Sequence, residues 1–189
     1  MKTWTRALGA SLRMLAVATL VLGVAYPLFG LGVGLLFPHQ ANGSLIEVDG
    51  EVVGSSLLGQ NFEGDEWFHG RPSASGYDGL ASGGSNLGPN NPDLVAAIQE
   101  QIDTIAATEG VEPGDIPADA VTASSSGLDP HISPAYADLQ VARVAAARGI
   151  SEEDVRALVA DATTGRPLGV LGEPTVNFVT LNVALAAGQ

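Results

Sequence analysis

The stretch MLAVATLVLGVAYPLFGLGVGLLF, residues 14–37, contains no charged side chain. As a helix that rises about 1.5 Å per residue, this run of 24 residues would be about 36 Å long. The hydrocarbon core of a bilayer is about 30 Å thick. The stretch therefore predicts one helix that crosses a membrane near the N-terminus.

A cleaved secretory signal peptide is the alternative interpretation, since Lys2, Arg6 and Arg13 precede the apolar run as a basic n-region would. Two features favour an uncleaved anchor. The apolar core of a signal peptide reaches only about 15 residues. In addition, the exit FPHQAN, residues 37–42, lacks the small-x-small pattern of a cleavage site.

The same three basic residues set the expected orientation of the chain. All of them lie before the span, and the next basic residue is Arg71. Because basic residues are retained on the cytoplasmic side, the N-terminus is expected in the cytoplasm. We therefore expect a cytoplasmic N-terminus at residues 1–13, a transmembrane helix at 14–37 and an extracytoplasmic domain at 38–189.

The second half of the span is rich in glycine, and Gly30 and Gly34 form a G-x-x-x-G pair. Small residues at this spacing let a second membrane helix approach closely, which predicts a helix partner. The other interpretation is that glycine and proline are common in membrane helices generally, with Pro27 adding only a kink. The sequence leaves both interpretations open.

The 152 residues after the span are enough for one domain with its own core. They hold five arginines, no lysine and all 21 acidic residues, so their formal charge is 5 − 21 = −16. Such a charge excludes a nucleic-acid partner, repels an anionic membrane surface and attracts cations. The chain has no cysteine, which excludes disulfides and thiolate metal sites.

Turn and capping residues divide the exported part into short elements that together predict an α+β domain. Asp49 and Gly50 are typical of a tight hairpin turn between strands at 45–48 and 51–53. Helices are expected to begin after caps at Asn91, Ser133 and Ser151. Residues 176–185 suit a closing strand, although 181–187 could equally form a helix. Residues 60–91 form a polar loop, whose aromatic residues favour order over a disordered linker.

Familiar catalytic motifs are missing from the sequence: it has no G-x-x-x-x-G-K-[ST], no H-E-x-x-H and no EF-hand loop. A serine hydrolase is conceivable from Ser124, Ser125 or Ser126 with Asp129 and His131, because a nucleophile needs a base and the base an orienting carboxylate. These residues fall within eight positions and lack a G-x-S-x-G elbow. A polar turn is therefore the favoured interpretation.

Two further patterns bear on cofactors. His39, His69 and His131 lie far apart and lack metal-ligand spacing, so no metal site is predicted. One glycine-rich segment could cradle a phosphate with consecutive backbone N–H groups, although a structural turn is favoured. That segment consists of Ser82, Gly83, Gly84 and Ser85. Its loop also holds Arg71, Asn86, Asn90 and Asn91, and such a loop is ordered only if these groups bond one another or a partner.

Seven blocks stand together in an order that is typical of one family. The chain resembles KdpC, the C subunit of the bacterial and archaeal Kdp potassium-transporting P-type ATPase, over nearly its whole length, including the single span. The blocks are GSLI (43–46), LGQNF (58–62), FHGRPSA (68–74), SGGSNLGP (82–89), VTAS (121–124), GLDPHISP (127–134) and LGEPTVN (171–177).

The resemblance implies a non-catalytic accessory subunit of a high-affinity potassium uptake complex in the plasma membrane of a prokaryote. Its implied partners are a channel-like, potassium-translocating subunit and a P-type ATPase subunit, which uses ATP and Mg²⁺ while K⁺ is transported. The family has been proposed to contact ATP, which would involve the segment from Ser82 to Ser85. An exported domain cannot reach cytoplasmic ATP, so a stabilising role at the outer mouth of the channel-like subunit is the preferred interpretation.

Partner contacts are expected at Gly30 and Gly34 in the membrane and at Arg71, Asn86 and Asn91 in the domain. Two other classes remain as alternatives: a membrane-anchored extracytoplasmic serine hydrolase and an anchored solute-binding module. The first requires a reactive serine among residues 124–126, and the second requires a chain that acts without companions.

Overall fold

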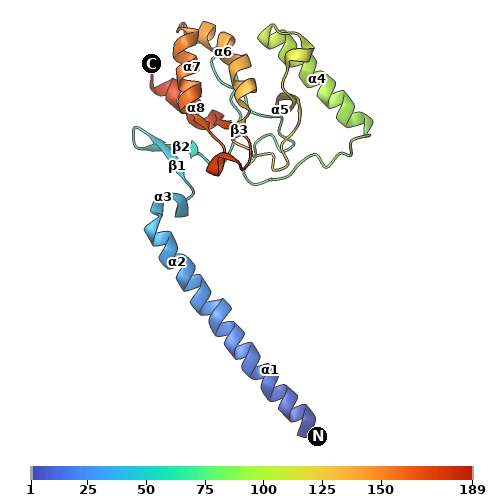
Figure 1. Cartoon of the computed structure of the whole chain (residues 1–189), viewed down its shortest axis with the longest axis vertical. Coiled ribbons are helices and arrows are strands. Elements are labelled where there is room, and N and C mark those ends of the chain that lie inside the picture. Colours follow the sequence, from blue (N-terminus) through green and yellow to red (C-terminus); the bar gives the residue numbers. More distant parts are fainter. Residues whose placement is uncertain (1, 189) are drawn as a thin grey trace. The chain divides into compact units, whose positions relative to one another are not determined.

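The computed structural model describes residues 2–188, which divide after Ser44 into two compact units. The first contains the long apolar helix and the second is a domain of helices and two small sheets (Figure 1). This confirms the prediction of an α+β domain on one transmembrane helix.

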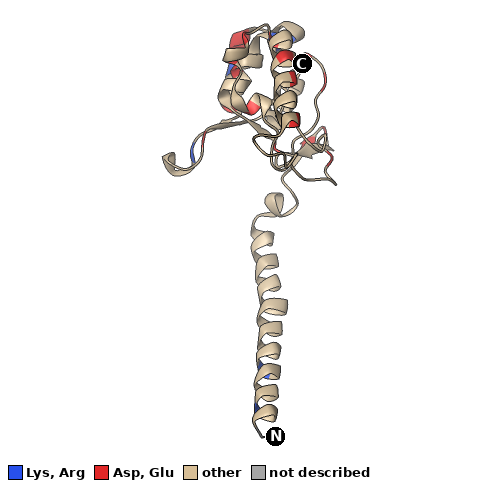
Figure 2. Ribbon diagram, turned by 90° about the vertical axis from the view of Figure 1, so that its right-hand side faces the viewer, with Lys and Arg blue, Asp and Glu red and all other residues tan. Residues whose placement is uncertain are grey.

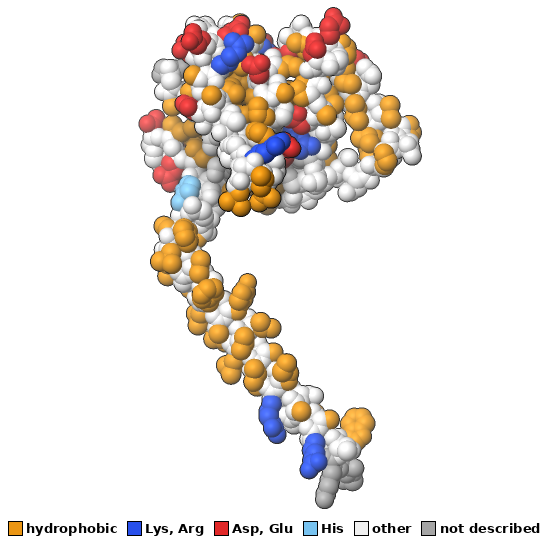
Figure 3. All heavy atoms as spheres, viewed as in Figure 1, with side chains coloured by type: hydrophobic (Ala, Val, Ile, Leu, Met, Phe, Trp, Pro, Cys, Tyr) orange, Lys and Arg blue, Asp and Glu red, His pale blue; other side chains and the backbone are white. Residues whose placement is uncertain are grey.

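The first unit is built from α1 (Lys2–Leu20), η1 (Val21–Ala25), α2 (Tyr26–Leu36) and the short α3 (Pro38–Ala41). Residues 3–36 form one continuous helix, the only one in the described chain that is long and apolar enough to span a membrane. Its 34 residues correspond to about 51 Å, so it is longer than a bilayer core is thick. Hydrophobic side chains cover it except near the N-terminal end, where basic ones lie (Figure 3).

Pro27 is accommodated by a wider turn just before it. Residues 21–25 form a π-helical turn, and the backbone N–H of Tyr26 donates to the carbonyl oxygen of Val21, five residues back. Proline lacks an N–H, and its ring collides with the carbonyl four residues back in a regular α-helix. One extra residue in the preceding turn relieves that collision.

The domain begins with the predicted hairpin, in which β1 (Leu45–Val48) pairs antiparallel with β2 (Glu51–Ser55). Asp49 and Gly50 both have positive φ, 52° and 82°, as a tight two-residue turn requires.

Three predicted helices begin at their expected caps. In α4 (Pro92–Glu109) the Asn91 side chain accepts from the N–H of Asp93; α6 (Pro134–Arg148) and α7 (Glu152–Asp161) are capped by Ser133 and Ser151. Between α4 and α6 lie the short η2 (Pro113–Asp115) and α5 (Ala118–Val121).

The closing strand is much shorter than predicted. Only β5 (Thr175–Asn177) is extended, between β3 (His131–Ile132) and β4 (Thr163–Thr164) in an antiparallel sheet. The chain then forms α8 (Phe178–Ala187), so the strand prediction for 176–185 is wrong beyond Asn177 and the helical alternative is correct. The Asn177 side chain accepts from the N–H groups of Val179 and Thr180, and this cap overrides the β propensity of the run.

The core lies where α6 and α8 meet the three-stranded sheet, with α7 packed against both helices (Figure 1). Its largest fully buried apolar side chains are Phe68, Ile132, Val141, Val144, Val155, Val176, Phe178, Val179 and Leu181.

Two buried amides order the loop at residues 60–91. Asn182 of α8 accepts from the N–H of Phe68 and donates to its carbonyl oxygen, both at 2.9 Å. Gln140 of α6 binds His69 in the same way, at 2.7 and 3.1 Å. Each amide therefore satisfies a backbone pair as a neighbouring strand would, so the loop is ordered, as its aromatic residues predicted.

Candidate functional site

Arg71 lies at the centre of the candidate site, which we call the loop face and define as residues 69–86 together with 118–133. The Arg71 guanidinium donates to the carbonyl oxygens of Thr122 (3.3 and 3.2 Å) and Ala123 (3.4 Å) and to Asp129 Oδ2 (3.2 Å). The hydroxyl of Tyr77 donates to the carbonyl oxygen of Arg71 at 2.6 Å. One side chain thus joins both segments of the loop face.

The glycine-rich segment, residues 82–85, packs on the serine cluster, which consists of Ser124, Ser125 and Ser126. The Gly83 N–H and the Ser82 hydroxyl both donate to the carbonyl oxygen of Ser126, at 2.7 and 3.0 Å. A Cβ at Gly84 would lie 3.2 Å from the carbonyl oxygen of Ser125, so glycine allows this close approach. Because the Gly83 N–H already bonds the chain's own backbone, it is not available to a phosphate in this conformation.

The hydroxyls of the serine cluster stabilise turns. Ser124 is buried, and its Oγ accepts from the N–H of Gly127 at 2.8 Å. The Oγ of Ser126 accepts from the N–H of Leu128 at 3.1 Å. These contacts agree with the polar-turn interpretation of residues 124–131.

Asp129 is the electrostatic partner of the site. Besides Arg71, its carboxylate accepts from the backbone N–H of His131 at 3.0 Å and lies 3.5 Å from His131 Nδ1. Burial acts to raise the pKa of Asp129, but the hydrogen bonds from His131 and the charge of Arg71 outweigh it and lower the pKa below its ordinary value. Burial and the negative charge of Asp129 raise the pKa of Tyr77 to about 12, although the positive charge of Arg71 acts to lower it. Asp129 is therefore a stable anion, and Tyr77 a neutral donor.

A hollow of about 380 Å³ opens beside this cluster and gathers blocks that are distant in sequence. On one side, Asp119 accepts from the backbone N–H and the hydroxyl of Ser133, at 2.7 and 2.8 Å. The polar residues that line the hollow are Arg71, Asp119, Asp129, His131, Ser133, Glu173 and Thr175.

The structure brings together only part of the predicted set. Arg71 lies in the loop face, and Asn86 has a positive φ of 54° with its side chain donating to the carbonyl oxygen of Gly84. Asn91 caps α4. Gly30 and Gly34 lie in the first unit, on the apolar helix. Apart from the backbone of the helix itself, a Cβ added at Gly30 would have no described atom within 4 Å. The partner roles of these five residues stay predictions.

Sequence reasoning missed Tyr77, Asp119 and Glu173. Tyr77 could have been found as an aromatic residue six positions after Arg71 in the same polar loop, and Glu173 as a member of the LGEPTVN block. Asp119 carries no local signal. Among residues 2–188, the structure contains no group of three His, Asp or Glu side chains placed to hold a metal ion.

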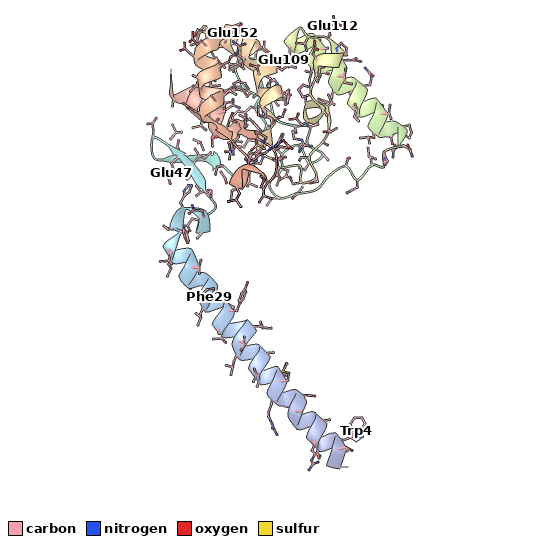
Figure 4. All side chains as sticks on the ribbon, viewed as in Figure 1. Trp4, Phe29, Glu47, Glu109, Glu112 and Glu152 are labelled. Atoms are coloured by element: carbon pink, nitrogen blue, oxygen red, sulfur yellow. The ribbon has the colours of Figure 1, made fainter. Side chains whose placement is uncertain are left out.

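A buried ion pair between α4 and α6 helps to fix the loop at residues 60–91. Glu109, the last residue of α4 and labelled in Figure 4, accepts from Arg143 Nε at 2.9 Å; their side chains are 4% and 8% exposed. Arg143 also donates to the carbonyl oxygens of Asp65 (2.6 Å) and Trp67 (2.9 Å). Burial raises the pKa of Glu109, with Arg143 opposing it, and Glu109 Oε2 has no partner in the described structure.

These features define a class: a single-span membrane protein with one acidic α+β domain, whose loops are fixed by internal polar contacts. The model of the family described as "KdpC: K+-transporting ATPase, c chain" matches residues 8–187, which include most of the apolar helix and the domain. The chain belongs to the KdpC family, as its sequence blocks predicted.

Three relatives, each named as a potassium-transporting ATPase KdpC subunit, are similar over nearly their whole length. The one from Kineococcus radiotolerans is 57% identical over 176 residues, 92% of this chain and 90% of that protein. The one from Gemmatimonas aurantiaca is 58% identical over 181 residues, 93% and 89% of the two chains. The one from Sorangium cellulosum is 54% identical over 179 residues, 93% and 94% of the two chains.

Proposed function

We propose that this chain is a non-catalytic accessory subunit of an ATP-driven potassium uptake complex. In this proposal it stabilises the assembly at the outer face of a channel-like, potassium-translocating subunit. Family membership and the names of the relatives support the complex and its ion. A P-type ATPase subunit is the second proposed partner, and ATP and Mg²⁺ are used there.

One observation carries the accessory role over the hydrolase alternative: the polar groups of the loop face bond one another. Ser124 and Ser126 accept backbone N–H groups, and Asp129 is held by Arg71 and His131. A nucleophilic serine needs a hydrogen-bonded base instead. A rigid, internally satisfied surface suits docking, because little conformational entropy is lost when it binds.

The proposed orientation follows from the basic residues before the span, which favour a cytoplasmic N-terminus and an exported domain in a prokaryotic plasma membrane. An exported domain has no access to cytoplasmic ATP. The use of the Gly83 N–H by the chain's own backbone also weighs against a nucleotide contact at Ser82, Gly83, Gly84 and Ser85.

Purification of the tagged chain from its native membrane in detergent tests the proposal. We expect two larger, very hydrophobic companions in fixed ratio. A chain that purifies alone would favour a solute-binding module, and labelling of Ser124, Ser125 or Ser126 by an active-site serine probe would favour the hydrolase. Protease added to intact spheroplasts should digest the domain; full protection of the domain would refute the orientation.

The membrane contact can be tested with a matched pair of variants. Replacing both Gly30 and Gly34 by leucine should loosen the complex, because bulk at that spacing separates packed helices. Gly32→Leu is the control, since two residues along a helix correspond to about 200° of rotation and point to the opposite side. Equal recovery of companions with all variants would mean that the contact lies elsewhere.

A further inference from the structure

The segment between β4 and β5, residues 165–174, leaves the body of the domain as an arm that ends in η3 (Pro167–Gly169) (Figure 2). The tip is a defined turn, since the N–H groups of Gly169 and Leu171 donate to the carbonyl oxygens of Arg166 and Pro167 at 2.9 and 3.0 Å. Arg166 and Glu173 form an ion pair across its base.

The tip directs apolar side chains into solvent. Leu168, Val170 and Leu171 are 88%, 78% and 55% exposed, and hydrophobic atoms gather there on the face drawn in Figure 3. Exposed apolar residues scattered singly are ordinary, but a cluster rimmed by charges is typical of a binding site.

The backbone of Leu168 gives an independent indication. Its φ of 54° and ψ of 15° lie in the left-handed region, which costs free energy for leucine and very little for glycine or asparagine. Neither burial nor hydrogen bonding of the side chain requires leucine at this position. Strain at an exposed apolar residue favours a role outside the fold of the free chain.

A protein pocket fits this tip better than a lipid surface does. The arm, GRPLGVLGEP, has no tryptophan, tyrosine or lysine to anchor it at a membrane interface, and its one arginine is paired with Glu173. The formal charge of −16 on the exported part is repelled by anionic lipid. A neutral apolar tip with a charged rim matches the usual core and rim of a protein interface.

We propose that Leu168, Val170 and Leu171 form a knob that inserts into an apolar pocket on a companion protein subunit. The base of the arm continues into the loop face, since Glu173 and Thr175 line the same hollow as Arg71 and Asp129. The arm and the loop face therefore form one docking surface, with the arm as its apolar anchor. This inference rests on the proposed function, because it requires that the chain has companions.

Photocrosslinking in membranes that contain the whole complex tests the knob. The photoreactive amino acid p-benzoylphenylalanine is introduced at position 168 or, as a control, at Val95, which is 59% exposed on α4 and lies outside the arm and the loop face. We expect an adduct with a companion subunit from position 168 only. Labelled phospholipid, an adduct with a second copy of this chain, or no adduct in the intact complex would overturn the inference.

A pair of substitutions gives a second readout. Leu168→Asn should lower recovery of companions about tenfold, because a central apolar contact is lost, while the melting temperature of the purified chain stays equal or rises. Val95→Asn, at an exposed position of α4 outside this surface, should change neither. A lowered melting temperature with unchanged recovery would overturn the knob, since Leu168 would then serve the fold.

The two proposals fail in different ways. An adduct with the ATPase subunit alone would retain the knob and refute the position at the channel-like subunit. If companions co-purify in fixed ratio but position 168 gives no adduct and Leu168→Asn does not lower their recovery, the accessory role is retained and the knob is refuted.

Discussion

Two irregular segments of the domain, the loop at 60–91 and the arm at 165–174, share a high content of glycine and proline but have opposite structural roles. The loop contains the fully buried Phe68 and is bound by side chains from α6 and α8. The arm points its apolar residues outward, and its side chains are joined by one surface ion pair.

Glycine and proline content therefore does not decide whether a loop belongs to the scaffold; buried apolar residues and buried polar partners do. A backbone group removed from water needs a hydrogen bond, so each buried amide or guanidinium fixes the segment it contacts. A segment without such partners contributes little to the scaffold and is expected to have low local stability. The predictions below test this contrast.

The largest effect is expected for Arg143→Met. The change leaves the buried Glu109 carboxylate without its cation and the carbonyl oxygens of Asp65 and Trp67 without a donor. Breaking a buried pair in this way costs about 3 to 5 kcal/mol. Urea unfolding of the full chain in detergent, followed by Trp67 fluorescence in a Trp4→Phe background, measures it.

A double variant sharpens that result. Adding Glu109→Gln to Arg143→Met removes the stranded carboxylate, so the pair should be less destabilised than Arg143→Met alone, with a coupling above about 0.5 kcal/mol. Additive losses would mean that the buried pair is not what supports the loop.

Asn182→Leu should have the next largest effect. The variant keeps the branched shape and the number of heavy atoms of the side chain but leaves the N–H and carbonyl of Phe68 buried and unpaired. Each unsatisfied buried group costs about 1 to 3 kcal/mol, so we expect a loss of about 3 kcal/mol in the same unfolding assay. Asn90→Leu, at an exposed position of the same loop, is the control. Equal stability of the two variants would contradict the role of the buried amide.

The sequence predicts contacts between neighbouring residues better than contacts between distant ones. The starts of α4, α6 and α7 were predicted because their caps, Asn91, Ser133 and Ser151, act on backbone within three residues. Gln140 and Asn182 act across 71 and 114 residues of chain. A polar residue in a helical pattern is ordinarily assigned to the solvent side, so neither was predicted.

The candidate site follows the same rule. Arg71 and Asn86 could be grouped because they share one polar loop. The pairing of Arg71 with Asp129, and of Asp119 with Ser133, depends on how the chain returns to that loop. The strand prediction for 176–185 failed because a local cap at Asn177 and burial in the core decided the structure there, rather than β propensity.

A smaller effect is expected from pH. Burial lowers the pKa of His69, and the positive charge of Arg143 lowers it further. The hydrogen bond to the Gly64 carbonyl oxygen and the negative charges of Asp65 and Glu66 act in the opposite direction but are outweighed. The unfolded chain takes up this proton near pH 6.5, but the folded chain does so only at lower pH. The folded state therefore binds fewer protons, and stability that is complete above pH 6.5 is lost as the pH falls below it.

His69→Gln isolates this contribution. Unfolding free energies at pH 7.5 and 5.5 should differ less in the variant than in the parent. The raised pKa of Glu109 acts with the opposite sign, since its stability contribution is lost as the pH rises through that pKa, but it is common to both proteins. Identical pH dependence of variant and parent would show that the loop does not bury His69 in a way that opposes its charging.

The smallest effect is expected in the arm, for Arg166→Gln. Its pair with Glu173 is solvent-exposed on both sides. The attraction is screened by water and salt, and holding two long side chains in one geometry costs entropy. We therefore expect the free energy of unfolding to change by less than about 0.5 kcal/mol at 0.15 M salt. Arg143→Met, which removes one arginine from a buried ion pair and from two backbone carbonyl oxygens, is the comparison in the same assay. A loss above about 1 kcal/mol for Arg166→Gln would mean that the arm belongs to the scaffold after all, and the contrast between the two loops would fail.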